Sequence, residues 1–146
     1  MTTITRKAGA LWNGNLRNGD GSISTESQAL FEQAYSFNTR FGDEKGSNPE
    51  ELIAAAHAAC YSMALASTLE KKGYQPQQVN TSATCFLVSK EGGGFEIKKM
   101  ELYVRGEVPN LDEATFKQIA MEADKGCPVS NLLRSGLDIK IDAGLM

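Results

Sequence analysis

The first third of the chain alternates between apolar and polar residues, the pattern of β-strands with one buried face. Alternation over residues 4–12 ends at Asn13-Gly14, a dipeptide that favours the positive φ angles of a hairpin turn. Strand-like runs follow at 22–25 and 35–41, and in the second run the aromatic residues lie on one face and Arg40 on the other. The pattern predicts antiparallel strands in this part of the chain.

A long apolar segment follows. Residues 48–51 read Asn-Pro-Glu-Glu, a helix start with proline and acidic side chains in the first turn, and no charged residue occurs from 52 to 69. Because apolar or small residues occur all around this helix, it is predicted to be buried on every side. Its length reaches the lower limit for crossing a bilayer, but its alanines, its four polar side chains and flanks without an aromatic belt argue against membrane insertion. One short chain has little sheet to surround such a helix, so dimerisation is expected.

Alternation returns in the second half. Residues 79–88 and 95–108, joined by three consecutive glycines at 92–94, form a predicted antiparallel hairpin. Its apolar positions change parity partway along the second strand, which predicts a bulge near Lys98-Lys99.

Two shorter helices are predicted after this hairpin. Asp112 is the expected N-cap of a helix that stops at Gly126, and Cys127-Pro128 begins a second helix that ends at Gly136. Residues 137–141 alternate as a last strand. The mixture of antiparallel strands and helices is typical of an α+β fold.

Composition limits the partners. The chain has 146 residues with 15 basic and 18 acidic side chains, a formal net charge of −3, and no run of five like charges. This balance argues against a nucleic acid or an anionic membrane surface as the main partner. No apolar stretch of signal-peptide length opens the sequence, so a cytoplasmic location is expected. No linker or repeat divides the chain, and residues 1–146 are interpreted as a single domain.

Three cysteines are too few for a secreted disulfide framework and need separate explanations. Cys60 lies in the middle of the apolar helix, where packing in place of alanine is the simplest explanation. A reactive thiol there needs a cation from elsewhere, because the helix dipole fades within the first turn. Cys127 stands at a helix N-cap, where free backbone N–H groups favour a thiolate although Ser or Asp would cap better. Cys85 lies in a strand and is interpreted as packing.

Charged and imidazole side chains offer further candidates. Arg40 and Glu50 flank a polar loop, and the glycines of this loop permit bends that bring the two side chains together. Strand alternation favours a different interpretation, in which Arg40 points into solvent and Glu50 only complements the positive end of the helix. His57 is an i, i+3 neighbour of Cys60, as a thiol hydrolase would need, but a lone histidine on an apolar helix is more often a hydrogen-bonded core residue. The spacing of the histidine and the cysteines does not fit a zinc site, and neither a metal nor a cofactor is expected.

Three segments resemble one known family. They read YSFNTRF at 35–41, NPEELIAAAHAAC at 48–60 and GCPVS at 126–130. Their order and spacing, and the length of the chain, are similar to those of the osmotically inducible protein C and organic hydroperoxide resistance (OsmC/Ohr) family. The likeness covers essentially the whole chain, and the first segment and the loop before residue 48 look like the OsmC branch.

The resemblance implies a fold and a set of roles. Antiparallel sheets enclose long central helices in an intertwined homodimer, with the site at the subunit interface. Cys60 is then the peroxidatic nucleophile, Cys127 the resolving thiol, Arg40 the cation beside Cys60, and Glu50 the carboxylate that orients Arg40. The choice of Cys60 as nucleophile rests on the resemblance, because helix position alone favours Cys127.

The implied activity is that of a thiol-dependent peroxidase acting on organic hydroperoxides. Attack forms a Cys60 sulfenate and an alcohol, a Cys60–Cys127 disulfide follows, and an external dithiol of lipoyl or thioredoxin type restores both thiols. Two alternatives stay open. One is a non-catalytic ligand-binding or structural dimer, a stress protein in which the cysteines only pack and cap. The other is a Cys-His hydrolase with His57 as base.

Overall fold

The computed structural model describes residues 2–136 and 140, and these residues form two compact units, 1–53 and 54–146. The predicted last strand at 137–141 lies outside the described residues except for Lys140. The interpretation of the chain as a single domain stays a prediction.

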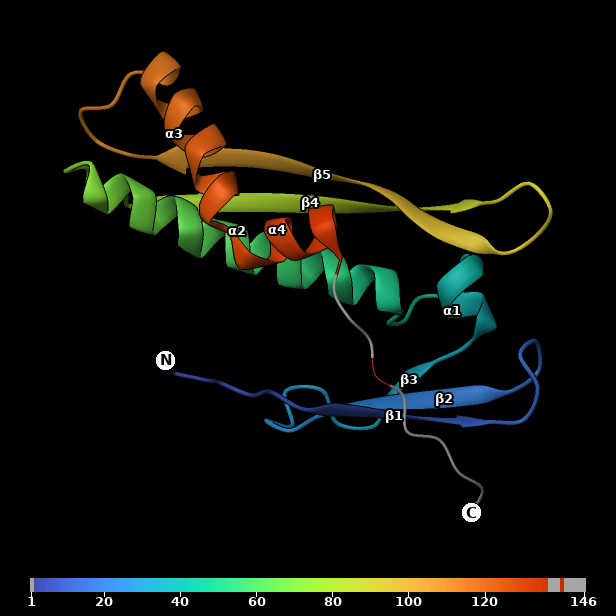
Figure 1. Ribbon diagram of the computed structural model, residues 1–146. Helices are drawn as coiled ribbons and strands as arrows, with labels where there is room; N and C mark the ends of the chain where they lie inside the picture. The colour runs from blue at the N-terminus through green and yellow to red at the C-terminus, as the bar shows by residue number, and fades with distance from the viewer. Residues whose placement is uncertain (1, 137–139, 141–146) are drawn as a thin grey trace. The chain divides into compact units, whose positions relative to one another are not determined.

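The first unit holds a three-stranded antiparallel sheet in the order β1–β2–β3 (Figure 1). Its strands are β1 (Ala8–Asn13), β2 (Asp20–Thr25) and β3 (Gln33–Tyr35). Asn13 pairs with Asp20, so the predicted hairpin is present, but a six-residue loop rather than a tight turn connects its strands. Gly14 takes the expected positive φ of 84°.

The predicted strand at 35–41 is wrong after its first residue. Residues Phe37–Phe41 form a short helix, α1, capped by Ser36. The Ser36 hydroxyl accepts the Thr39 backbone N–H at 3.2 Å, and Thr39 Oγ1 accepts the Ser36 backbone N–H at 2.8 Å. This reciprocal capping box satisfies donors that a helix start leaves unpaired, and it overrides the alternation of aromatic residues. The helical spacing brings the Phe37 and Phe41 rings together, with centroids 4.9 Å apart.

The long helix α2 spans Pro49–Lys71, and Asn48 Oδ1 accepts the Glu51 backbone N–H at its start. It was predicted to be buried on every side, but in a single chain only one stripe is buried. That stripe recurs every four residues at His57, Tyr61, Leu65 and Leu69. The opposite stripe, which includes Ala55, Ala59 and Met63, is exposed. One chain therefore buries only one face of this helix.

The second unit packs α2 against a two-stranded sheet and two helices (Figure 1). The strands β4 (Gln78–Ser89) and β5 (Phe95–Glu107) pair antiparallel, and Lys98 is bypassed between the pairs Phe86–Lys99 and Leu87–Ile97, which confirms the predicted bulge. Leu65 and Leu69 of α2 form the core with the helix that follows β5.

Both predicted short helices are confirmed. Helix α3 (Glu113–Gly126) has Asp112 as its N-cap, and helix α4 (Pro128–Ser135) is capped by Cys127 and ends at Gly136. Tyr61 of α2 donates its hydroxyl hydrogen to the Ala120 carbonyl of α3 at 2.7 Å. Burial raises the pKa of Tyr61 to about 12, because the charged phenolate is disfavoured there.

Replacing Gly106 by alanine is expected to destabilise the fold. A Cβ at this position of β5 would lie 2.6 Å from Phe116 Cε2 of α3, which is closer than real contacts allow. Overpacking of this kind costs about 1–3 kcal/mol, which corresponds to a melting temperature lower by about 3–10 °C. Gly9→Ala is the matched control, because a Cβ at Gly9 meets nothing within 4 Å. Equal melting temperatures for the two variants would show that α3 moves away at no cost.

Candidate thiol site

The structure brings Cys60 and Cys127 together. Cys60 comes from the middle of α2 and Cys127 from the junction of α3 and α4, and their sulfur atoms lie 3.5 Å apart. This separation is longer than the roughly 2.05 Å of a disulfide, so both thiols are reduced. The two sulfurs are close enough to form a disulfide with a small movement.

Cys127 is the more acidic of the two thiols and is fully buried. Its sulfur accepts the Ser130 backbone N–H at 3.5 Å, as the side chain of a helix N-cap does. Burial raises the pKa of Cys127, but hydrogen bonds from Ser130, Cys60 and Val129 lower it more, so the net pKa lies below the ordinary value. The first turn of α4 thus stabilises a thiolate, as its place in the sequence predicts.

Cys60 is half-buried and less acidic. Burial raises the pKa of its thiol, the neighbouring Cys127 raises it further, and a hydrogen bond from the Val129 backbone opposes both. None of these three influences is a cation. Because burial and Cys127 both disfavour the thiolate, an ionised Cys60 needs a positive charge nearby.

His57 contacts Ser130 rather than Cys60. Its Nε2 lies 2.7 Å from Ser130 Oγ, while its buried Nδ1 has no hydrogen-bond partner among the described residues. This confirms the interpretation of His57 as a hydrogen-bonded core residue. The Cys60–His57 pair that a hydrolase needs is not formed, and Ser130, 73 residues away in sequence, takes its place.

Arg40 and Glu50 form the pair that the loop glycines permit, and Arg40 also stays exposed to solvent, as the other interpretation expected. Arg40 Nε donates to both Glu50 oxygens at 3.1 and 3.2 Å, and Nη2 donates to Oε1 at 2.7 Å. The fork of hydrogen bonds fixes the guanidinium plane. The Glu50 side chain is 11% exposed and the Arg40 side chain 36%, so the guanidinium can still meet an anion. The placement of this pair beside the cysteines stays a prediction.

The histidine and the cysteines do not gather into a set of metal ligands among the residues that the structure describes. No group of three or more His, Cys, Asp or Glu side chains with the geometry of a metal site occurs in the described part of the chain. Cys85 lies half-buried in β4.

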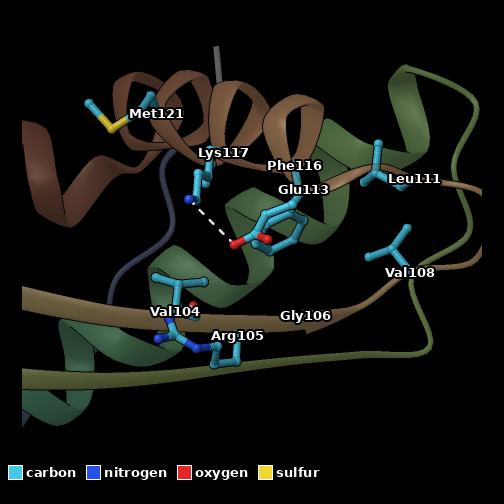
Figure 2. Close-up of a pocket in the computed structure, with 10 residues that line it drawn as sticks. Val104, Arg105, Gly106, Val108, Leu111, Glu113, Phe116, Lys117 and Met121 are labelled. Carbon is cyan, nitrogen blue, oxygen red and sulfur yellow. Dashed lines mark hydrogen bonds and ion pairs between the residues drawn. The ribbon is translucent and has the colours of Figure 1, made fainter.

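Two cavities lie in the second unit, and neither is lined by a cysteine. One of about 670 Å³ lies between β5 and α3, with Phe116 and Met121 among its apolar lining and the Glu113–Lys117 ion pair at its edge (Figure 2). A second, of about 520 Å³, is lined by His57 and Ser130 together with side chains of β5, α3 and α4.

Two neighbouring cysteines, one on a long helix and one at the first turn of a short helix, define a dithiol site that can alternate between thiols and a disulfide. The chain belongs to the OsmC-like protein family, whose model matches residues 42–142. The family predicted from the three segments is therefore confirmed.

The comparisons agree across sequence and structure. The chain is 47% identical to the peroxiredoxin OsmC of Escherichia coli (strain K12) over 137 residues, which cover 94% of this chain and 95% of that protein. Its structure is similar to that of an organic hydroperoxide resistance protein OsmC from Legionella pneumophila, with a TM-score of 0.68, 24% identity and 96% of each chain covered. It is also similar to OhrB of Bacillus subtilis, with a TM-score of 0.66, 23% identity, and 92% and 95% of the chains covered. These structures confirm the predicted α+β, OsmC-like fold.

Proposed function

We propose that this protein is a cysteine-based peroxidase that reduces organic hydroperoxides to alcohols. The observation that carries the proposal is the 3.5 Å separation between the half-buried Cys60 sulfur and the buried Cys127 sulfur at the start of α4. The names of the relatives, peroxiredoxin OsmC and organic hydroperoxide resistance protein, support the same chemistry.

Exposure decides which thiol attacks. Cys127 is the stronger acid but is 0% exposed, whereas Cys60 is partly accessible. The Cys60 thiolate attacks one oxygen of the hydroperoxide, the O–O bond breaks, and the alkoxide leaves and takes up a proton as the alcohol. Cys127 then attacks the Cys60 sulfenic acid, forming the disulfide and releasing water. An external dithiol, of lipoyl or thioredoxin type, returns both cysteines to thiols.

Arg40 supplies the positive charge that Cys60 lacks. A guanidinium beside the sulfur favours the thiolate and stabilises the negative charge that develops on the leaving oxygen. Glu50 holds the guanidinium through its forked hydrogen bonds and leaves the outer part of the group exposed. Burial would otherwise keep the thiol protonated.

A second copy of the chain completes the site. Glu50 precedes Cys60 by ten residues in α2, and ten helical residues rise about 15 Å, which is too far for Arg40 to stay on Glu50 and reach the sulfur of its own helix. We therefore place the Arg40 guanidinium beside the partner subunit's Cys60. The exposed stripe of α2 with Ala55, Ala59 and Met63 gives this homodimer an apolar surface to bury.

The exposed apolar stripe of α2 is also relevant to where in the cell the protein is found. Among the described residues, α2 is long and apolar enough to cross a bilayer by length and composition. In the homodimer that we propose, the second subunit rather than a bilayer buries the exposed stripe of α2. We therefore propose a cytoplasmic protein, with neither a nucleic acid nor a membrane as partner.

Cumene hydroperoxide is expected to be a better substrate than hydrogen peroxide. An apolar substrate gains about 0.8 kcal/mol for each buried methylene group, which hydrogen peroxide cannot gain. Steady-state turnover with dihydrolipoamide or thioredoxin measures this preference, and protein with alkylated thiols is the control. Equal turnover before and after alkylation would contradict the peroxidase and favour the non-catalytic dimer.

A further inference from the structure

A buried row of polar groups leads away from Cys127. The Ser130 backbone N–H donates to the Cys127 sulfur at 3.5 Å, and His57 Nε2 lies 2.7 Å from Ser130 Oγ. The Ser130 hydroxyl also lowers the pKa of Cys127. All three residues are at least nine-tenths buried, with exposures of 0% for Cys127, 4% for Ser130 and 5% for His57. Such a network is shielded from water, so each hydrogen bond in it is strong.

The direction of the hydrogen bonds follows from the proton count. A serine hydroxyl has one hydrogen, and a hydroxyl that lowers the pKa of Cys127 must point that hydrogen toward the sulfur. Ser130 Oγ must then accept from His57, which places the imidazole hydrogen on Nε2 and leaves Nδ1 as a bare acceptor. The unpartnered Nδ1 fits this arrangement, because it has no hydrogen to donate.

The surroundings of His57 keep the ring neutral. Burial lowers its pKa, Asp124 of α3 opposes this, and Arg134 of α4 adds to it. Asp124 and Arg134 form an ion pair with each other, so their charges largely cancel. Lys98 and Lys99 of β5 line the same cavity as His57 and disfavour a further positive charge. A neutral ring can act as a fixed donor to Ser130.

We propose that His57 and Ser130 are positioning residues for the resolving step: His57 orients the Ser130 hydroxyl, and that hydroxyl holds the Cys127 sulfur as a thiolate aimed at Cys60. The inference rests on the proposed peroxidase function. Ser130 is too buried to act as a nucleophile itself, although its contact with His57 has the form of a Ser-His dyad.

The step is balanced within the site. The Cys127 thiolate contributes the electron pair of the new S–S bond, and the S–O bond of the Cys60 sulfenic acid breaks. Cys127 is oxidised and the Cys60 sulfur is reduced. The departing hydroxide takes up one proton, equal to the one that Cys127 lost on ionising, and leaves as water. No further oxidant or acid is required.

The first test measures the ionisation of Cys127 in a Cys60→Ser background, by the ultraviolet absorbance of the thiolate against pH. Ser130→Ala removes the hydroxyl but keeps the backbone N–H, and the ionised fraction at neutral pH is expected to fall about tenfold or more, as for the loss of one hydrogen bond to a charged group. Ser130→Thr keeps the hydroxyl and is expected to titrate like its parent.

Two amide variants separate positioning from burial. Glutamine at 57 places an N–H near the position of Nε2, whereas asparagine places it near Nδ1. His57→Gln is therefore expected to retain the ionisation of Cys127 and His57→Asn to lose it. Identical titrations for these two, or an unchanged titration for Ser130→Ala, would overturn the proposal. The titration uses no hydroperoxide, so its outcome is independent of the peroxidase assay.

The second test follows the sulfenate itself. With Cys60 intact and one equivalent of cumene hydroperoxide, Ser130→Ala is expected to accumulate a Cys60 sulfenate that dimedone traps and mass spectrometry detects, whereas the unmodified protein passes on to the disulfide. Ser62→Ala is the matched control, since the Ser62 hydroxyl bonds Thr81 at 2.8 Å away from the thiols. Equal trapping in both variants would overturn the proposal, and no sulfenate in a Cys127→Ser variant would instead overturn the peroxidase function.

Discussion

Cys60→Ser is expected to reduce hydroperoxide turnover to the uncatalysed level, while Cys127→Ser keeps a single turnover and then stops. The difference follows from exposure, because a hydroperoxide can reach the half-buried Cys60 but not the fully buried Cys127. Without Cys127 the Cys60 sulfenate has no partner thiol at 3.5 Å and persists. Alcohol released per subunit and dimedone trapping measure the two halves of this prediction.

The outcome also separates acidity from access. Cys127 has the lower pKa, and if acidity alone selected the nucleophile, Cys127→Ser would be inert and Cys60→Ser would give the trapped sulfenate. That reversed result would exchange the two roles. Cys85→Ser, in β4, is the control for the loss of a thiol.

Local signals in the sequence predicted most of the second unit. Asp112, Cys127 and Gly136 mark helix ends through their own side chains or backbone, and the structure has helices that begin and end there. The bulge at Lys98 was predicted because a change in apolar parity needs an extra residue in one strand. Such features depend on neighbouring residues only, which is why the sequence alone reveals them.

The errors have equally specific causes. The strand at 35–41 was predicted from alternation, although Ser36 and Thr39 carry the spacing of a capping box and favour the helix that forms. The His57–Ser130 contact has no local signal, because it joins residues 73 apart through the packing of α4 on α2. The helix α2 was predicted to be buried on every side with the help of a second subunit, and one chain buries only the stripe from His57 to Leu69.

Arg40→Met is expected to lower kcat/KM for cumene hydroperoxide by about 10²-fold to 10³-fold, the usual effect of removing a group that stabilises charge in a transition state. Arg40→Lys keeps the charge but not the fork of hydrogen bonds with Glu50, so it should recover only part of the loss. Arg105→Met, which removes an arginine stacked over Tyr103, is the control. A rate unchanged in Arg40→Met would remove Arg40 from the site.

Mixed dimers decide whether Arg40 acts on its own Cys60 or on the partner's. A heterodimer of one Arg40→Met subunit and one Cys60→Ser subunit, isolated with two affinity tags, holds one complete site if the subunits exchange arginines, and about half of the native activity returns from two inactive parents. If Arg40 serves its own chain, nothing returns. The reciprocal dimer joins a native subunit to a subunit that carries both Arg40→Met and Cys60→Ser. It is expected to be inactive if the subunits exchange arginines and to keep about half of the native activity if they do not. The roughly 15 Å rise of α2 between Glu50 and Cys60 favours exchange, because an arginine held on Glu50 cannot also reach the sulfur ten residues along the same helix.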